Sequence, residues 1–120
     1  MAKQIINLTP HDLSVWDEDG NVVVTIPKSG IIARAAEVVE DGSTVLVGSV
    51  EVPSGTKRLT GELVGYEPKG GEDYYVSLPF AMAVAAMGLP TDQLLVSLRD
   101  HRNDRGAVDG TMAIGRFSVA

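Results

Sequence analysis

The feature that most constrains this chain is the spacing of its apolar residues, which alternate with polar residues in short runs that end at Gly, Pro, Asn or Asp. Such alternation turns one side of a strand toward a core and the other toward solvent, and it is typical of half-buried β-strands rather than of helices. The pattern predicts a mainly β (α+β) fold, either a compact antiparallel sheet or a small β-barrel, with one short helix.

The clearest local prediction is a hairpin that joins strands at residues 13–17 and 22–26. The residues between them include Asp19-Gly20, a pair favoured in turns that need positive φ. The second strand is β-branched almost throughout, which suits a pleated surface. Turn residues at 27–30 and 40–43 then predict that the chain continues as a meander, with strands at 31–39 and 44–52.

One stretch departs from the strand period. Pro79 can occupy the first turn of a helix, the residues that follow are rich in Ala and Met, and Gly88 and Pro90 form a helix stop. The apolar run is much shorter than the roughly 20 residues of a membrane-spanning helix, so it predicts a core helix. Closing strands are expected at 94–98 and 112–119, joined by a polar loop.

The charge balance excludes several kinds of partner. Sixteen acidic residues outweigh ten basic ones, which gives a formal net charge of -6 and a pI near 4.7. Such a chain lacks the extended basic surface that duplex nucleic acid or an anionic membrane would attract. It contains no cysteine, which excludes disulfides, zinc–thiolate sites and cysteine nucleophiles.

Length and organisation predict a single domain over residues 1–120, because no internal repeat or linker interrupts the pattern. The first residues lack the apolar run of a secretory signal. We therefore expect a cytoplasmic chain, which means the host cytoplasm or the virion if a phage encodes it.

The segment Thr9-Pro10-His11-Asp12 is a first candidate site. Pro10 prevents ordinary strand pairing and biases Thr9 toward an extended conformation, so Thr9 and His11 are held in a defined loop. His11 could form hydrogen bonds or transfer a proton. The alternative is structural, with Thr9 and Asp12 capping a turn and His11 packed at the mouth of a barrel.

A second candidate is the Arg-rich segment that begins at Arg99 and Asp100. Residues 1–98 carry a net charge of -7, whereas residues 99–120 carry +1. Guanidinium groups bind phosphate or carboxylate through paired donors, so the segment could hold a small anion. The alternative is a solvated loop in which neighbouring Arg and Asp side chains satisfy one another.

Known catalytic and cofactor motifs are absent from the sequence. Residues 17–21 resemble the start of a calcium loop, but Val22 and Lys28 occupy the positions where Gly and Glu are needed. The two histidines do not form a zinc motif, and there is no phosphate-binding or dinucleotide-binding glycine loop. We therefore predict no metal site and no cofactor, and a non-enzymatic role is favoured.

Several short motifs resemble a family of small uncharacterised bacterial and phage-encoded proteins with an N-terminal Asn-Leu-Thr-Pro-His motif. They lie at residues 6–11, 26–30, 33–34, 61–65, 75–77 and 99–100, and at Gly115 and Phe117. The resemblance spans nearly the whole chain and implies no activity, but it selects a set of candidate binding residues. These are Thr9, His11, Arg34, Glu62, Ser77, Arg99 and Asp100.

Three functions follow as hypotheses. The first is a small β-rich binding protein, an accessory factor of a phage or mobile element that recognises a partner protein or a small anionic ligand. The second is a structural or virion-associated homo-oligomer in which exposed strand edges pair between subunits. The third is a small enzyme that uses His11 as acid or base beside Arg34, Glu62, Arg99 or Asp100.

Overall fold

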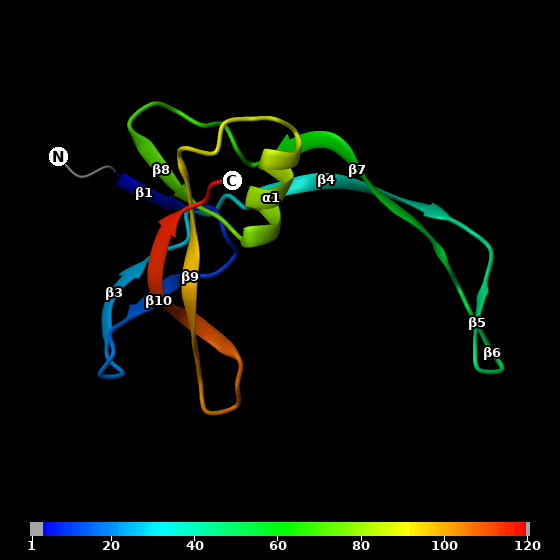
Figure 1. Ribbon diagram of the computed structural model, residues 1–120, viewed down its shortest axis with the longest axis horizontal. Helices are drawn as coiled ribbons and strands as arrows, with labels where there is room; N and C mark the ends of the chain where they lie inside the picture. The colour runs from blue at the N-terminus through cyan, green and yellow to red at the C-terminus, as the bar shows by residue number, and fades with distance from the viewer. Residues whose placement is uncertain (1–3, 120) are drawn as a thin grey trace.

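The computed structural model describes residues 4–119, and Figure 1 shows their arrangement. In chain order the elements are β1 (Gln4–Asn7), β2 (Leu13–Trp16), β3 (Val22–Ile26), β4 (Arg34–Asp41), β5 (Val45–Val47), β6 (Val50–Val52), β7 (Gly55–Val64), β8 (Glu72–Tyr75), α1 (Leu78–Ala86), β9 (Leu94–Arg102) and β10 (Val108–Arg116). The prediction of a mainly β fold with one short helix is confirmed.

Six strands form one sheet in the order β1-β8-β9-β10-β2-β3. The β9–β10 and β2–β3 pairs are antiparallel, whereas β1 and β8, β8 and β9, and β10 and β2 run parallel. Just beyond β3 the chain returns to the first strand, because Lys28 forms a parallel bridge with Asn7 and the Ser29 N–H donates to the Asn7 carbonyl at 3.0 Å. The sheet therefore curves into a small, partly closed barrel.

Apolar side chains pack on both sides of this curved sheet. The side that faces α1 buries Tyr74, Val76, Leu94 and Val96 of the sheet region against the helix. On the other side, side chains from all six strands of the sheet meet. These are Ile5, Leu13, Val15, Ile26, Tyr75, Leu95 and Ile114. Because every strand contributes, this second cluster is the interior of the barrel.

Helix α1 begins and ends where the sequence indicates. The Ser77 hydroxyl oxygen accepts a hydrogen bond from the Phe80 N–H at 3.4 Å, and Pro79 lies in the first turn. Phe80, Ala81 and Val84 are buried against the sheet. The chain leaves the helix through Gly88, whose φ of 71° favours glycine. Among residues 4–119, no helix is long and apolar enough to span a membrane.

Strands β4 and β7 do not join the barrel. They pair with each other from Arg34 and Val64 to Asp41 and Gly55, and β5 and β6 pair beyond them. We call residues 34–64 the arm, which extends from the barrel to the far right of Figure 1 and bends near its end. The described chain measures 57 × 38 × 31 Å with a radius of gyration of 17.7 Å. A compact domain of this length has about 14 Å, so the arm accounts for the elongation.

The arm corrects the predicted meander. The segment at 31–39 was expected to pair with its neighbours in sequence, but β4 pairs with β7, which follows it only after the β5–β6 hairpin. The expected strand at 44–52 is divided by a turn at Gly48, whose φ is 63°. Glu40 and Asp41 of the predicted turn at 40–43 lie in β4, and the turn at Gly48 is not predicted, so both the turns and the pairing partners of this segment are corrected.

A second correction concerns the polar segment at 99–110. The sequence predicts a loop there, but β9 continues to Arg102 and β10 begins at Val108. Antiparallel pairing joins Arg102 to Val108 and Asp100 to Thr111. Polar side chains on both faces hid these strands, because this hairpin extends past the core and neither face needs to be apolar.

Candidate functional site

The turn after β1 is organised by Asn7, which is 1% exposed. Its side-chain amide donates to the carbonyl oxygens of His11 and Ile26, and its side-chain oxygen accepts from the N–H and the hydroxyl of Thr9 at 3.0 and 2.6 Å. Thr9 is thus held in a structural network that fastens the turn to β3. His11 is exposed, and its hydrogen bonds within residues 4–119 run through its main-chain oxygen.

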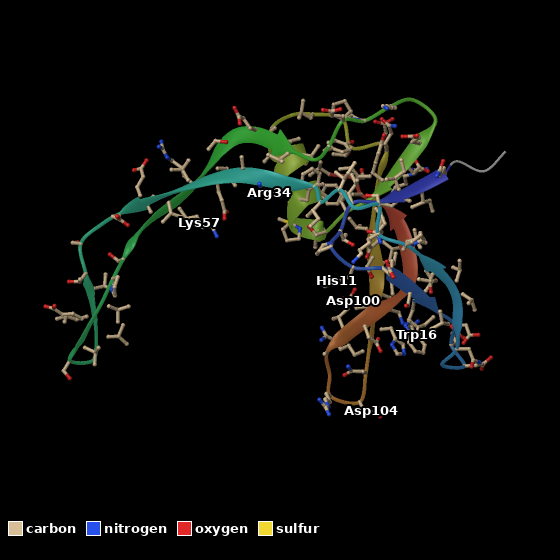
Figure 2. The ribbon with its side chains drawn as sticks, turned by 180° about the vertical axis from the view of Figure 1, so that it is seen from behind. His11, Trp16, Arg34, Lys57, Asp100 and Asp104 are labelled. Carbon is tan, nitrogen blue, oxygen red and sulfur yellow. The ribbon has the colours of Figure 1, made fainter. Side chains whose placement is uncertain are left out.

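Arg34 and Ser77 are brought together. Both line a groove of about 350 Å³ where the base of the arm meets α1, and the other lining residues are mostly apolar. Figure 2 places Arg34 at the base of the arm, next to the barrel. Glu37 lines the same groove, and its carboxylate pairs with Lys57 at 3.1 Å.

Arg99 and Asp100 lie on β9 rather than in a loop, and both are exposed. The Ser97 hydroxyl donates to the Asp100 carboxylate at 2.7 Å and lies 2.7 Å from the buried Thr111 hydroxyl. Burial raises the pKa of the nearby Tyr75, and the charge of Asp100 raises it further. This cluster joins β8, β9 and β10, which accounts for its hydrogen bonds structurally.

Glu62 stands apart from the other candidates. It is exposed on β7 beside Gly61, whose φ of 87° accompanies an irregularity in the pairing with β4. The seven residues therefore lie in four places, which are the β1–β2 turn, the groove at α1, strand β9 and the arm. Only Arg34 and Ser77 share a groove.

A cluster that the sequence analysis missed joins Trp16 of β2 to the β9–β10 hairpin. The Trp16 and His101 rings stack with centroids 4.0 Å apart and planes at 4°, and His101 Nδ1 lies 2.5 Å from Asp109 Oδ1. A Cβ on Gly110 would lie 2.4 Å from the Ser14 carbonyl oxygen, so only glycine allows this approach. Treating residues 99–110 as a loop concealed the pairing that brings these residues together.

The Asp109–His101 pair orients an imidazole, as acid–base sites do. Within residues 4–119, however, no nucleophilic side chain forms a hydrogen bond to His101. Its ring lies against Trp16 instead, so the arrangement fastens the hairpin to the barrel. The Trp16 indole nitrogen is buried without a hydrogen-bond partner among the described residues.

A second missed pair is Asp73 and Arg116. Two guanidinium nitrogens of Arg116 contact the two carboxylate oxygens of Asp73 at 2.5 and 2.8 Å, and Asp73 is 5% exposed. The hydrogen bonds to Asp73 raise the pKa of Arg116. Arg116 also donates to the Asp92 carbonyl, so it joins β8 and the end of β10 to the chain before β9. Arg116 and Asp73 form a two-point ion pair with each other, and we assign this pair a structural role.

Many of the exposed large apolar residues lie on the arm, namely Val38, Val39, Val45, Leu46, Val47, Val50, Val52, Leu59 and Val64. Along its stem, Lys57 pairs with Glu37 at 3.1 Å and Arg58 pairs with Glu40, and all four side chains are largely exposed. Figure 2 shows side chains standing free along the ribbon and around Lys57. Exposed ion pairs of this kind contribute about 0–1 kcal/mol, so the stem is held mainly by its backbone ladder.

At the end of the arm the strand alternation produces one apolar face. Val45 pairs with Val52 and Val47 with Val50, so the four valines share a face, while Leu46 and Glu51 lie on the other. The valines are 37–63% exposed and Leu46 is 70% exposed. We call β5 and β6 together the tip. Its apolar face has the pattern of a strand that packs on a core.

Metal-binding side chains do not gather in the part of the chain that the structure describes. No group of three or more His, Asp or Glu side chains there could hold a metal ion. Comparison of the chain with protein-family models, curated protein sequences and solved structures gave no match in any of the three.

Proposed function

We propose that this chain is a non-enzymatic binding protein that attaches to a partner protein through the tip of its arm. One observation carries the proposal. Val45, Val47, Val50 and Val52 form a continuous apolar face that is 37–63% exposed. Exposed apolar surface of this kind, concentrated on a projecting element, marks protein interaction sites.

Energetics support a partner at the tip. A two-stranded ribbon alone is marginally stable in water, and it becomes stable when a third strand or another surface covers its apolar face. Covering the exposed part of each valine contributes about 1 kcal/mol. Four such contributions, about 4 kcal/mol in all, favour a partner that covers this face.

The proposal covers two of the predicted roles. An accessory factor of a phage or mobile element would use the tip to bind a partner of another sequence. A structural or virion-associated component would use it to bind other subunits. In both roles the barrel is the rigid body that carries the arm.

A small anionic ligand is a second candidate, favoured by the exposed Arg34 beside Ser77 in the groove at α1. Inorganic phosphate would then raise the melting temperature of the chain, and Arg34→Gln would remove that rise. An enzymatic role for His11 has less support, because its hydrogen bonds among the described residues use the main chain.

Photo-crosslinking tests the proposal. A benzophenone amino acid replaces either Val47 at the tip or Val108 on β10, two valines that are 63% and 52% exposed. In cells that make the chain, we expect protein adducts from position 47 and far fewer from position 108. Equal yields from the two positions, or none from position 47, would contradict the proposal.

A further inference from the structure

Strand β3 has one edge that is uncovered over most of its length. This strand pairs with β2 on one side, and its contact with β1 on the other side begins only at Ile26, whose carbonyl accepts from Asn7. Val22, Val23 and Val24 are 45%, 61% and 51% exposed. Natural edge strands are normally protected by charge, proline, a bulge or a cover. Residues 22–25 contain no charge and no proline, and the irregular pairing at Val23 is the one such feature in β3.

The tip offers strands of the same kind. Val-Leu-Val in β5 is uncharged, and each tip strand pairs on one side only within the described chain. Figure 1 places β3 and the tip at opposite ends of the molecule, so the tip cannot reach β3 of its own chain. A tip strand that pairs with a β3 edge must therefore come from another copy.

We propose that the partner of the tip is a second copy of this chain, and that β5 of one copy adds as a further strand to the free edge of β3 of the next. This inference rests on the proposed binding role of the arm. The main-chain groups of both edges would form a new ladder, and valines on the same side of the two strands would become cross-strand neighbours. Neither strand brings a charge to the contact.

The size of the surfaces sets the strength of the contact. The exposed apolar residues of the tip and of β3 together offer on the order of 700 Å², below the ~1,200 Å² of standard stable interfaces. One contact alone is therefore weak, and association rises with protein concentration. Each copy, however, has one tip and one β3 edge, so it can form two such contacts.

The contact is heterologous, because a tip meets a β3 edge rather than another tip. Repetition of a heterologous contact gives a ring if the rotation closes and a filament if it does not. This geometry distinguishes the proposal from a two-fold dimer in which β3 pairs with β3, or tip with tip. In either dimer, association would stop at two copies.

Two variants separate the two surfaces. Val47→Asp combined with Val50→Asp places two charges on the valine face of the tip, and Val23→Lys places one on the β3 edge. Ser49→Asp adds charge to the turn between β5 and β6, and Val108→Lys adds charge at an exposed valine whose strand is already paired on both sides. These two substitutions are the controls. Thr25→Lys, which charges an exposed polar position of the same strand, serves if Val23→Lys fails to fold.

Light scattering coupled to size exclusion, over a concentration series, gives the first result. We expect the unaltered chain and both controls to form species larger than dimers, and each of the two test variants to associate at least tenfold more weakly. A monomeric unaltered chain at high concentration would overturn the inference. Dimers as the largest species would overturn it too, as would association that resists either test variant.

Mixing the test variants gives the second result. The tip variant retains an intact β3 edge and the Val23→Lys variant retains an intact tip, so a mixture should form a one-to-one dimer and nothing larger. A mixture that stays monomeric contradicts the pairing of tip with β3. If position 47 crosslinks only to a different protein in cells, the binding role of the arm stands and the second copy is excluded as its partner.

Discussion

The barrel and the arm are built from the same kind of strand sequence, but only the barrel covers its apolar side chains. Leu94-Leu95-Val96 of β9 is an uninterrupted apolar run whose residues are 0%, 7% and 6% exposed, whereas Val45-Leu46-Val47 of β5 is a run of the same kind whose residues are 50%, 70% and 63% exposed. A short apolar run thus forms a strand in both regions. Whether the apolar side chains of a strand are buried depends on where that strand lies in the fold.

The largest contrast between the two regions is expected in how much a single Leu→Ala substitution lowers the free energy of unfolding. Leu94→Ala leaves a cavity in the core between the sheet and α1, and we expect it to lower the free energy of unfolding by about 2–5 kcal/mol. Leu46→Ala removes the same atoms from a side chain that is 70% exposed, and should change stability by less than about 0.5 kcal/mol.

Urea denaturation of the two variants, followed by circular dichroism at a concentration where the chain is monomeric, measures both effects. Similar losses in the two variants would mean that the arm is packed as firmly as the barrel. That result would break the distinction between the regions.

Alkaline pH should lower the stability of the barrel, and the tyrosines responsible lie outside the arm. Burial raises the pKa of Tyr66, Tyr74 and Tyr75 above the usual value near 10, and all three lie outside residues 34–64. A folded pKa above the unfolded one means that stability is complete below pH 10 and is lost as the pH rises through the folded pKa.

Tyr75→Phe removes one of these ionisations, so the variant should lose less stability between pH 9 and about 12 than the unaltered chain. Urea midpoints measured across that range, together with tyrosinate absorbance, test this expectation. An unchanged alkaline slope in the variant would show that Tyr75 ionises equally easily in the folded and the unfolded chain.

A smaller effect is expected at the base of the β9–β10 hairpin. His101→Ala removes the ring that stacks on Trp16 and the contact with Asp109, which should lower stability by about 1 kcal/mol. The chain has one tryptophan, so its fluorescence reports the change directly. His101→Phe keeps the stacked ring and should retain most of the stability, whereas losing as much as the alanine variant would assign the effect to Asp109.

The largest change to the chain should have only a small effect on the stability of the barrel. Replacing residues 36–62 by an Asn-Gly turn keeps the Arg34–Val64 and Ala35–Leu63 pairs at the base of the arm. We expect the barrel to unfold with a free energy within about 1 kcal/mol of the unaltered chain, since exposed residues contribute little. Association should be lost. An unfolded product would show that the arm stabilises the barrel.

Much of the fold could be predicted from local sequence. Turn residues and apolar spacing predict the β2–β3 hairpin, the end of α1 at Gly88 and the apolar first half of β9. The structure confirms all three. The arm could not be predicted in the same way, because the apolar residues of its strands look the same in sequence as those of barrel strands. Pairing between β4 and β7 joins residues 34 and 64, and no local signal encodes that distance.

The candidate site was predictable only in part. Arg34 and Ser77 meet in one groove, but Thr9 is engaged by Asn7, and Glu62 lies on the arm. The contact of Trp16 with His101 depends on the pairing of β2 with β10, which brings distant segments together. The exposed face of the tip was not foreseen, because a valine-rich run is indistinguishable from a core strand until its neighbours are known.

The chain leaves the barrel at Arg34 and returns at Val64, two residues that pair directly with each other. The arm is therefore a modular insertion whose length can vary without altering the barrel. Adding two residues to each of its strands would lengthen its reach by about 6.6 Å and keep the valines on the same face, whereas adding one residue would present the opposite face. Insertions and deletions in this segment would tune the spacing between bound partners, independently of how well either surface binds.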